Sequence, residues 1–160
     1  MLVRTQLGDK AAAAHFVAAH KNELGTLTKY VSLPQARAAA ATEQGKPLEA
    51  IAALEPARPY ELESYSVPMQ LAEIYRQAKQ IDQAVEQYKN ILANEGIDPV
   101  SPQVALAHLG LGRAYAMQNN KAESRHEYET LFNLWKDADP DLPVLQQAHL
   151  EYAQVNTNAK

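Results

Sequence analysis

The sequence predicts an all-α protein, a right-handed α-solenoid of antiparallel helix pairs with a C-terminal capping helix. Apolar residues recur at helical spacing, as they do through residues 71–78. A turn, a helix start and a small residue also recur, with the small residue at Ala50, Ala84 and Ser124. These residues are 34 and 40 positions apart, and a period near 34 is typical of stacked helix pairs. The 160-residue chain has no cysteine, so helix packing rather than disulfide bonds has to hold this fold together.

The periodic segments predict eight helices in order along the chain. We expect them at residues 9–23, 34–44, 47–57, 66–78, 81–93, 102–118, 121–136 and 142–156. Gly45 and Asn119 stand at turns between paired helices, where the backbone needs a positive φ. Lys79 takes the same place in another turn, so we expect that turn to be strained or longer. Ser101 followed by Pro102 predicts an N-cap with proline at the first helical position.

The repeat divides a single domain of residues 1–160 into units. A partial repeat at 1–33 precedes repeats at about 34–65, 66–100 and 101–139, and the capping helix is expected at 141–157. The last helix carries several polar side chains that suit a cap, which covers an apolar face and meets water outside. These residues are Gln146, Gln147, Glu151 and Gln154.

Two of the units share a detailed residue pattern. Each has a Leu-Gly or Leu-Ala pair, a tyrosine three residues later, a small residue nine further on and an aromatic four beyond that. The matching residues are Leu71, Ala72, Tyr75, Ala84 and Tyr88, and then Leu111, Gly112, Tyr115, Ser124 and Tyr128. This pattern resembles the tetratricopeptide repeat (TPR). The resemblance implies a superhelix of helix pairs whose first helices line a concave surface.

A second resemblance concerns the C-terminal half. Residues 107–116, followed by residues 134–143, are similar to the C-terminal TPR regions of Acidobacteria-type bacterial serine/threonine protein kinases and winged-helix regulators. That resemblance implies a sensor or regulatory domain at the C-terminus of a larger protein, which would carry the kinase or transcription domain outside this chain. The kinase's own motifs are absent from these 160 residues.

The sequence predicts neither an enzyme nor a catalytic, cofactor or metal site. The absence of cysteine excludes thiol catalysis and Cys-ligated metals. None of the five histidines pairs with another four residues away on a helix, which is the usual two-histidine metal grip. Residues 137–141 alternate carboxylates like a calcium loop, but Leu142 and Ala148 stand where that loop needs glycine and glutamate.

Charge and hydropathy exclude two further classes of partner. The net charge is -4, so no global basic field favours nucleic acid. No apolar run approaches the roughly 20 residues of a membrane-spanning helix, so we expect no direct membrane contact. We expect a cytoplasmic location, or an extracytoplasmic one if a parent protein has a preceding transmembrane helix.

The TPR resemblance implies a peptide groove at defined repeat positions. The candidate groove residues are Met69, Glu73, Arg76, Gln77, Leu109, Arg113, Met117, Gln35, Thr42 and Glu43. Chaperone-binding relatives hold a terminal carboxylate with Lys and Asn at the fifth and ninth positions. Here those positions hold Met69 and Glu73, then Leu109 and Arg113, so we do not expect that clamp. Methionine and leucine beside arginine suit a segment that mixes apolar and acidic residues.

We therefore predict a non-catalytic protein–protein interaction module, whose partner is a protein or peptide segment bound on the concave face. One alternative is the regulatory domain of a kinase or transcription regulator. The other is a self-associating structural module. In that case the truncated first repeat would expose an apolar helix face with Phe16 and Val17, and this edge would stack against another copy.

Overall fold

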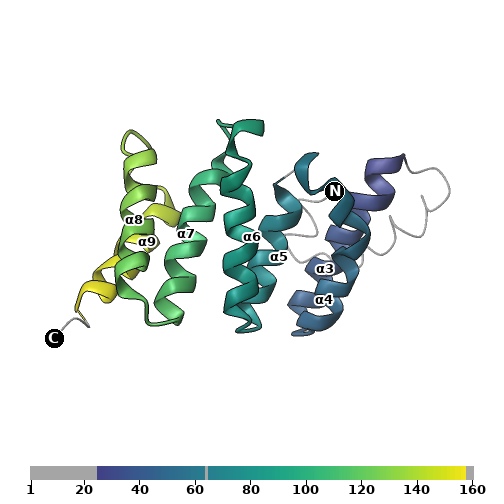
Figure 1. The fold of residues 1–160 in the computed structure, drawn as a ribbon, viewed down its shortest axis with the longest axis horizontal. Coiled ribbons are helices and arrows are strands. Elements are labelled where there is room, and N and C mark those ends of the chain that lie inside the picture. The colour runs from purple at the N-terminus through teal and green to yellow at the C-terminus, as the bar shows by residue number, and fades with distance from the viewer. Residues whose placement is uncertain (1–24, 64, 158–160) are drawn as a thin grey trace.

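In this computed structural model, the structure describes residues 25–63 and 65–157, and these are helical with no strand (Figure 1). The α-helices are α3 (Leu33–Glu43), α4 (Pro47–Leu54), α5 (Ser66–Gln77), α6 (Ile81–Ala93), α7 (Pro102–Met117), α8 (Lys121–Leu134) and α9 (Pro143–Thr157). The other helical segments are the π-helix η1 (Thr28–Ser32) and the 3₁₀ helices η2 (Glu55–Glu63) and η3 (Glu95–Ile97). The all-α prediction is confirmed for the described residues. The predicted helix at 9–23, with Phe16 and Val17, lies outside them.

Seven of the predicted helices occur, six of them with ends within two residues of the predicted ones. The helix predicted at 47–57 stops at Leu54 and continues as the 3₁₀ segment η2, which contains Pro59. Proline lacks the backbone N–H and its ring collides with the preceding turn, so an α-helix does not extend through this segment. A π-helical turn, η1, runs directly into α3 and was not predicted. The Ser101 N-cap is confirmed, because its hydroxyl accepts a hydrogen bond from the Gln103 N–H.

The three turns that join α3 to α4, α5 to α6 and α7 to α8 have one geometry. Their middle residues, Gly45, Lys79 and Asn119, have φ values of 71°, 61° and 59°. In each turn the middle N–H donates to the carbonyl three residues earlier, and the next N–H donates to the carbonyl five residues earlier. This is the Schellman pattern, in which a left-handed residue ends a helix. The predicted positive φ is confirmed at Gly45 and Asn119, and Lys79 adopts it too, in a turn of unchanged length.

The helices succeed one another along the long axis of the molecule, and the core follows them (Figure 1). Buried apolar residues form three clusters, around Leu54 and Leu71, around Tyr88 and Leu111, and around Leu131. The small residues predicted at Ala50, Ala84 and Ser124 are all fully buried. The last of them donates its hydroxyl to a carbonyl of α7 at 2.7 Å. Within the described residues, burial is therefore distributed along a row of helices rather than gathered in one centre.

Candidate functional site

A cleft with a volume of about 770 Å³ opens between α5, α7, α8 and α9. Three of the predicted groove residues line it, namely Arg76, Arg113 and Met117. The two arginines come from α5 and α7, which are the first helices of successive pairs, and Met117 lies at the end of α7 with 47% of its surface exposed. Lys121 and Val155 contribute a third cationic side chain and a further apolar wall. The cleft therefore combines cationic groups with accessible apolar surface.

Arg113 meets a glutamate of the last helix across this cleft. Its Nε donates to Glu151 Oε2 at 2.8 Å and its Nη2 to Oε1 at 3.1 Å, which is a bidentate ion pair. The Tyr128 hydroxyl donates to Oε2 at 3.0 Å, and Gln147 Nε2 donates to Oε1 at 3.0 Å. Burial alone would raise the pKa of Glu151, but the hydrogen bonds, led by that from Arg113, outweigh burial and hold this pKa below its ordinary value. The carboxylate of Glu151 thus stays ionised in the cleft wall.

Arg76 belongs to a similar group on α5 and α6. Its Nη2 donates to Glu73 Oε2 at 2.7 Å, and the Tyr88 hydroxyl donates to Glu73 Oε1 at 2.5 Å. Burial and the neighbouring Glu73 carboxylate raise the pKa of Tyr88 far above its usual range, so this tyrosine remains a hydrogen-bond donor. The Nε of Arg76 is buried and has no hydrogen-bond partner among the described residues. One donor of this guanidinium is therefore unsatisfied beside the cleft.

Other predicted groove residues lie away from this cleft. Gln35 donates to the Ser66 hydroxyl at 2.8 Å, so its side chain ties α3 to α5. Thr42 and Gln77 line a separate hollow of about 270 Å³ between α3, α4 and α5. Glu43 is exposed at the end of α3 and lines neither hollow. The structure therefore does not gather the ten candidates along one continuous groove.

Two candidates pack against the core, Leu109 fully buried and Met69 partly buried. Leu109 is only 2% exposed and packs in the cluster around Leu131, and Met69 packs against the cluster around Tyr88. The prediction that Leu109 offers a groove surface is wrong as to its exposure. The reason is that α7 contacts four helices, α5, α6, α8 and α9. These neighbours cover the side of α7 that carries Leu109.

The repeat pattern does not predict the contribution of α8 and α9 to the cleft. It places Glu151 only on a polar capping face, yet Glu151 is the direct partner of Arg113. A usable signal was the spacing of Gln147, Glu151 and Gln154, which places all three on one side of a helix. A second pair was also missed, because His108 Nδ1 lies 2.6 Å from Glu127 Oε2 across α7 and α8. Its members are 19 positions apart, so no local spacing reveals it.

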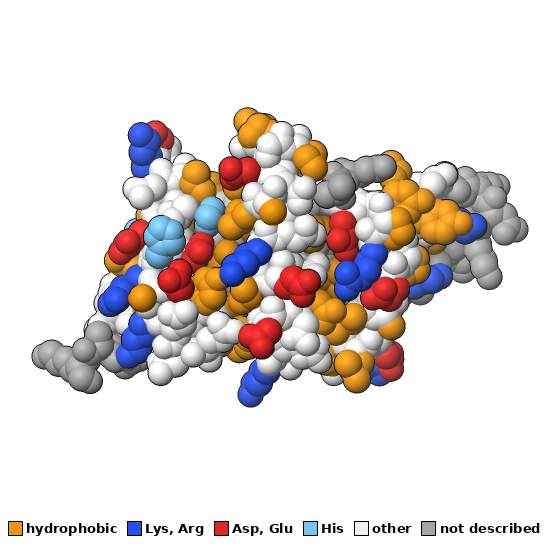
Figure 2. All heavy atoms as spheres, viewed as in Figure 1, with side chains coloured by type: hydrophobic (Ala, Val, Ile, Leu, Met, Phe, Trp, Pro, Cys, Tyr) orange, Lys and Arg blue, Asp and Glu red, His pale blue; other side chains and the backbone are white. Residues whose placement is uncertain are grey.

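In the part of the chain that the structure describes, no three His, Asp or Glu side chains group in a way that could hold a metal ion. In the same residues, no helix has both the length and the apolar composition to cross a membrane. Figure 2 shows acidic and basic side chains interspersed over one face. No protein-family model matches the chain, and no curated protein or solved structure matches it either.

Proposed function

We propose that the chain is a non-catalytic protein–protein interaction module that binds a peptide or protein segment in the cleft between α5, α7, α8 and α9. The observation that carries this proposal is the cleft itself, which joins two arginines to an exposed methionine. Anchoring apolar contacts and charge-assisted hydrogen bonds are the two features that hold a segment in a preformed groove. The proposal extends the interaction role that the sequence predicts.

We propose further that the helices form a right-handed α-solenoid of the tetratricopeptide type. The shared Schellman turns at Gly45, Lys79 and Asn119 support it, because they recur at the same intervals as the sequence pattern. Full burial of Ala50 and Ala84 supports it as well, since small residues let paired helices approach closely. In such a solenoid a cleft beside the first helix of each pair is an extended binding surface.

The chemistry of the cleft favours a segment that mixes acidic and apolar residues. Arg76, Arg113 and Lys121 line it together with the carboxylate of Glu151, and Glu73 pairs with Arg76 beside the cleft. Charge complementarity therefore favours an acidic partner and disfavours a basic one. Met117 adds a flexible, polarizable apolar surface, which adapts to side chains of different shape.

The proposal is tested by selecting peptides from a displayed library on the protein and measuring the affinity of the best one by fluorescence anisotropy. We expect Met117→Glu and Arg76→Glu each to weaken binding at least about tenfold, since each replaces a favourable contact by repulsion. Leu48→Glu is the matched control, because Leu48 is 71% exposed on α4 and does not line the cleft. Equal affinity of all three variants and the unaltered protein would refute the cleft as the binding site.

The double exchange Arg113→Glu with Glu151→Arg separates binding from folding. It keeps an ion pair between α7 and α9 and leaves the net charge unchanged, but it reverses which helix carries the cation. We expect thermal stability close to that of the unaltered protein together with weaker binding of the selected peptide. Loss of binding with loss of the fold would point instead to a structural effect of Arg113.

A further inference from the structure

Arg113 and Tyr128 already form a site that holds a carboxylate. A bidentate guanidinium and a phenol hydroxyl converge on the same group, with all three donor–acceptor distances between 2.8 and 3.1 Å. The group they hold is the side chain of Glu151, which comes from the last helix. A guanidinium fork matches a carboxylate in shape as well as charge, so these donors are suited to carboxylates in general.

The wall of the cleft brings this carboxylate site within reach of a bound segment. Arg113, Tyr128 and Glu151 all line the cleft, and the side chains of Arg113 and Glu151 are 25% and 22% exposed. The helix α9 is anchored to the core by its buried residues Leu145 and Ala148, and Tyr152 and Val155 pack against the same core. Rotation of the Glu151 side chain therefore frees Arg113 without removing these anchors from the core.

Resting on the function proposed above, we propose that the bound segment carries an Asp or Glu whose carboxylate replaces Glu151 on Arg113 and Tyr128. Glu151 is then an internal competitor for the acidic partner, and the apolar residues of the segment lie on the exposed Met117. The carboxylate of Glu151 pairs with Arg113 when the cleft is empty. Only a segment that offers both a carboxylate and apolar contacts binds strongly enough to displace it. Neutral apolar segments do not release it.

The test compares two fluorescein-labelled probes, Leu-Glu-Glu-Leu-Glu-Glu-Leu and the same peptide with Gln in place of each Glu. Glu151→Gln removes the competing charge while it keeps the size of the side chain. We expect this variant to bind the acidic probe at least about tenfold more tightly than the unaltered protein, with little change for the Gln probe. Adding Arg113→Gln to Glu151→Gln should abolish the gain.

Glu49→Gln is the matched control, since Glu49 is exposed on α4 and its removal changes the net charge equally. If the unaltered protein and Glu151→Gln both fail to bind the acidic probe and the selected peptides, the proposed function itself fails. If the unaltered protein binds and Glu151→Gln binds equally or more weakly, binding stands and the exchange with Glu151 is overturned.

A measurement on the unaltered protein covers the case in which Glu151→Gln does not fold. Hydrogen–deuterium exchange is followed in the C-terminal half of α9 while the acidic probe is added to saturation. Displacement of Glu151 loosens that half of α9, so we expect its amides to exchange faster in the complex. Unchanged or slower exchange with bound probe would overturn the inference.

Discussion

The helix pairs α5–α6 and α7–α8 build the same tyrosine–glutamate–arginine group from different sources. In the first pair Tyr88 donates to Glu73, which is on α5 and pairs with Arg76 three residues later. In the second pair the position equivalent to Glu73 holds Arg113, so no acceptor for the tyrosine stands there. Tyr128 instead donates to a glutamate of α9. The first group is complete within its pair, whereas the second depends on the following helix.

The two buried tyrosines, Tyr88 and Tyr128, also differ in how closely their rings pack against α7. The ring of Tyr88 lies against Gly110, where an added Cβ would stand 2.3 Å from ring carbons. The ring of Tyr128 lies against Gly112, where the corresponding distance is 3.0 Å. The contact between α6 and α7 is therefore the tighter one. Helix α7 therefore joins α6 by close packing, and it joins α8 and α9 partly through charged hydrogen bonds.

The largest expected effect comes from disturbing the tight contact between Gly110 of α7 and Tyr88 of α6. We expect Gly110→Ala to lower the free energy of unfolding by about 2 kcal/mol, because the buried Tyr88 ring has to shift to admit the methyl group. The loss outweighs the roughly 1 kcal/mol that alanine gains over glycine in a helix. Urea unfolding followed by circular dichroism measures it.

Two glycines serve as controls for this substitution. Gly112→Ala meets Tyr128 at 3.0 Å and should change the stability by less than about 1 kcal/mol, because a small shift of the ring suffices. Gly96→Ala meets no atom within 4 Å and should be nearly neutral. Equal losses at Gly110 and Gly112 would remove the distinction between the two contacts.

The second effect tests the dependence of α7–α8 on α9. We expect Glu151→Gln to destabilise the protein by about 1–2 kcal/mol at pH 7, because the charge-assisted hydrogen bonds of Arg113 are weakened. The folded-state pKa of Glu151 is lowered, so its contribution is present above the unfolded-state pKa and is lost as the pH falls through the folded value. The difference between variant and unaltered protein should therefore shrink as the pH drops below the ordinary glutamate range.

Thermal melts from pH 7 down to about 3 measure this dependence. Glu49→Gln is again the control, since its exposed ion pair with Lys46 contributes little and should give a small difference at every pH. A constant difference between Glu151→Gln and the unaltered protein across this range would contradict the assignment.

The third effect concerns the two tyrosine hydroxyls. We expect Tyr88→Phe and Tyr128→Phe each to cost about 1 kcal/mol, since each removes a hydrogen bond to a carboxylate. Combined with Glu151→Gln, Tyr128→Phe should be non-additive, because the first change weakens and the second removes the same hydrogen bond. Tyr88→Phe should be additive with Glu151→Gln. Double-mutant cycles by urea unfolding measure the two coupling free energies. A coupling between Tyr88 and Glu151 would show that the group around Glu73 and the group around Glu151 are not independent.

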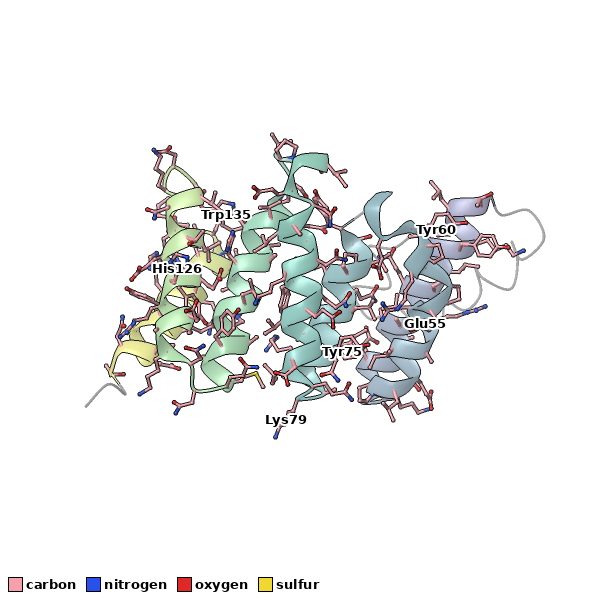
Figure 3. All side chains as sticks on the ribbon, viewed as in Figure 1. Glu55, Tyr60, Tyr75, Lys79, His126 and Trp135 are labelled. Carbon is pink, nitrogen blue, oxygen red and sulfur yellow. The ribbon has the colours of Figure 1, made fainter. Side chains whose placement is uncertain are left out.

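The smallest expected effect concerns the turns at Lys79 and Asn119, which both have a positive φ. Lys79 holds φ at 61° in the turn of α5–α6, where α7–α8 has Asn119 at 59°. We expect Lys79→Gly to stabilise the protein by about 0.5–1 kcal/mol, since glycine adopts this conformation without steric cost. Figure 3 shows Lys79 pointing away from the helices, so little packing is lost. Asn119→Gly should raise the stability by less, because asparagine tolerates positive φ better than lysine. Scanning calorimetry of the two variants measures both changes in stability, and a larger gain for Asn119→Gly would contradict this prediction.

Much of the helical plan was predictable because its determinants are local. Helix spans follow from apolar periodicity, and the turns at Gly45 and Asn119 follow from residues that accept positive φ. The turn at Lys79 adopts the same conformation against its own preference, because the flanking helices and their hydrogen bonds impose it. The π-turn before α3 carries no comparable local pattern and was not predicted. The 3₁₀ segment η2 was not predicted either, although Pro59 is a local signal against an α-helix there.

The cleft was only partly predictable, because it depends on contacts between distant segments. Arg76, Arg113 and Met117 were identified from their repeat positions, and they line the cleft. The burial of Leu109 depends on how four helices surround α7, and the partner of Arg113 lies 38 residues further along the chain. Local sequence thus determined the helices and their turns through short-range sterics and periodicity. Only the packed structure decided which faces stay open and which charges meet, because both result from long-range contacts that no spacing records.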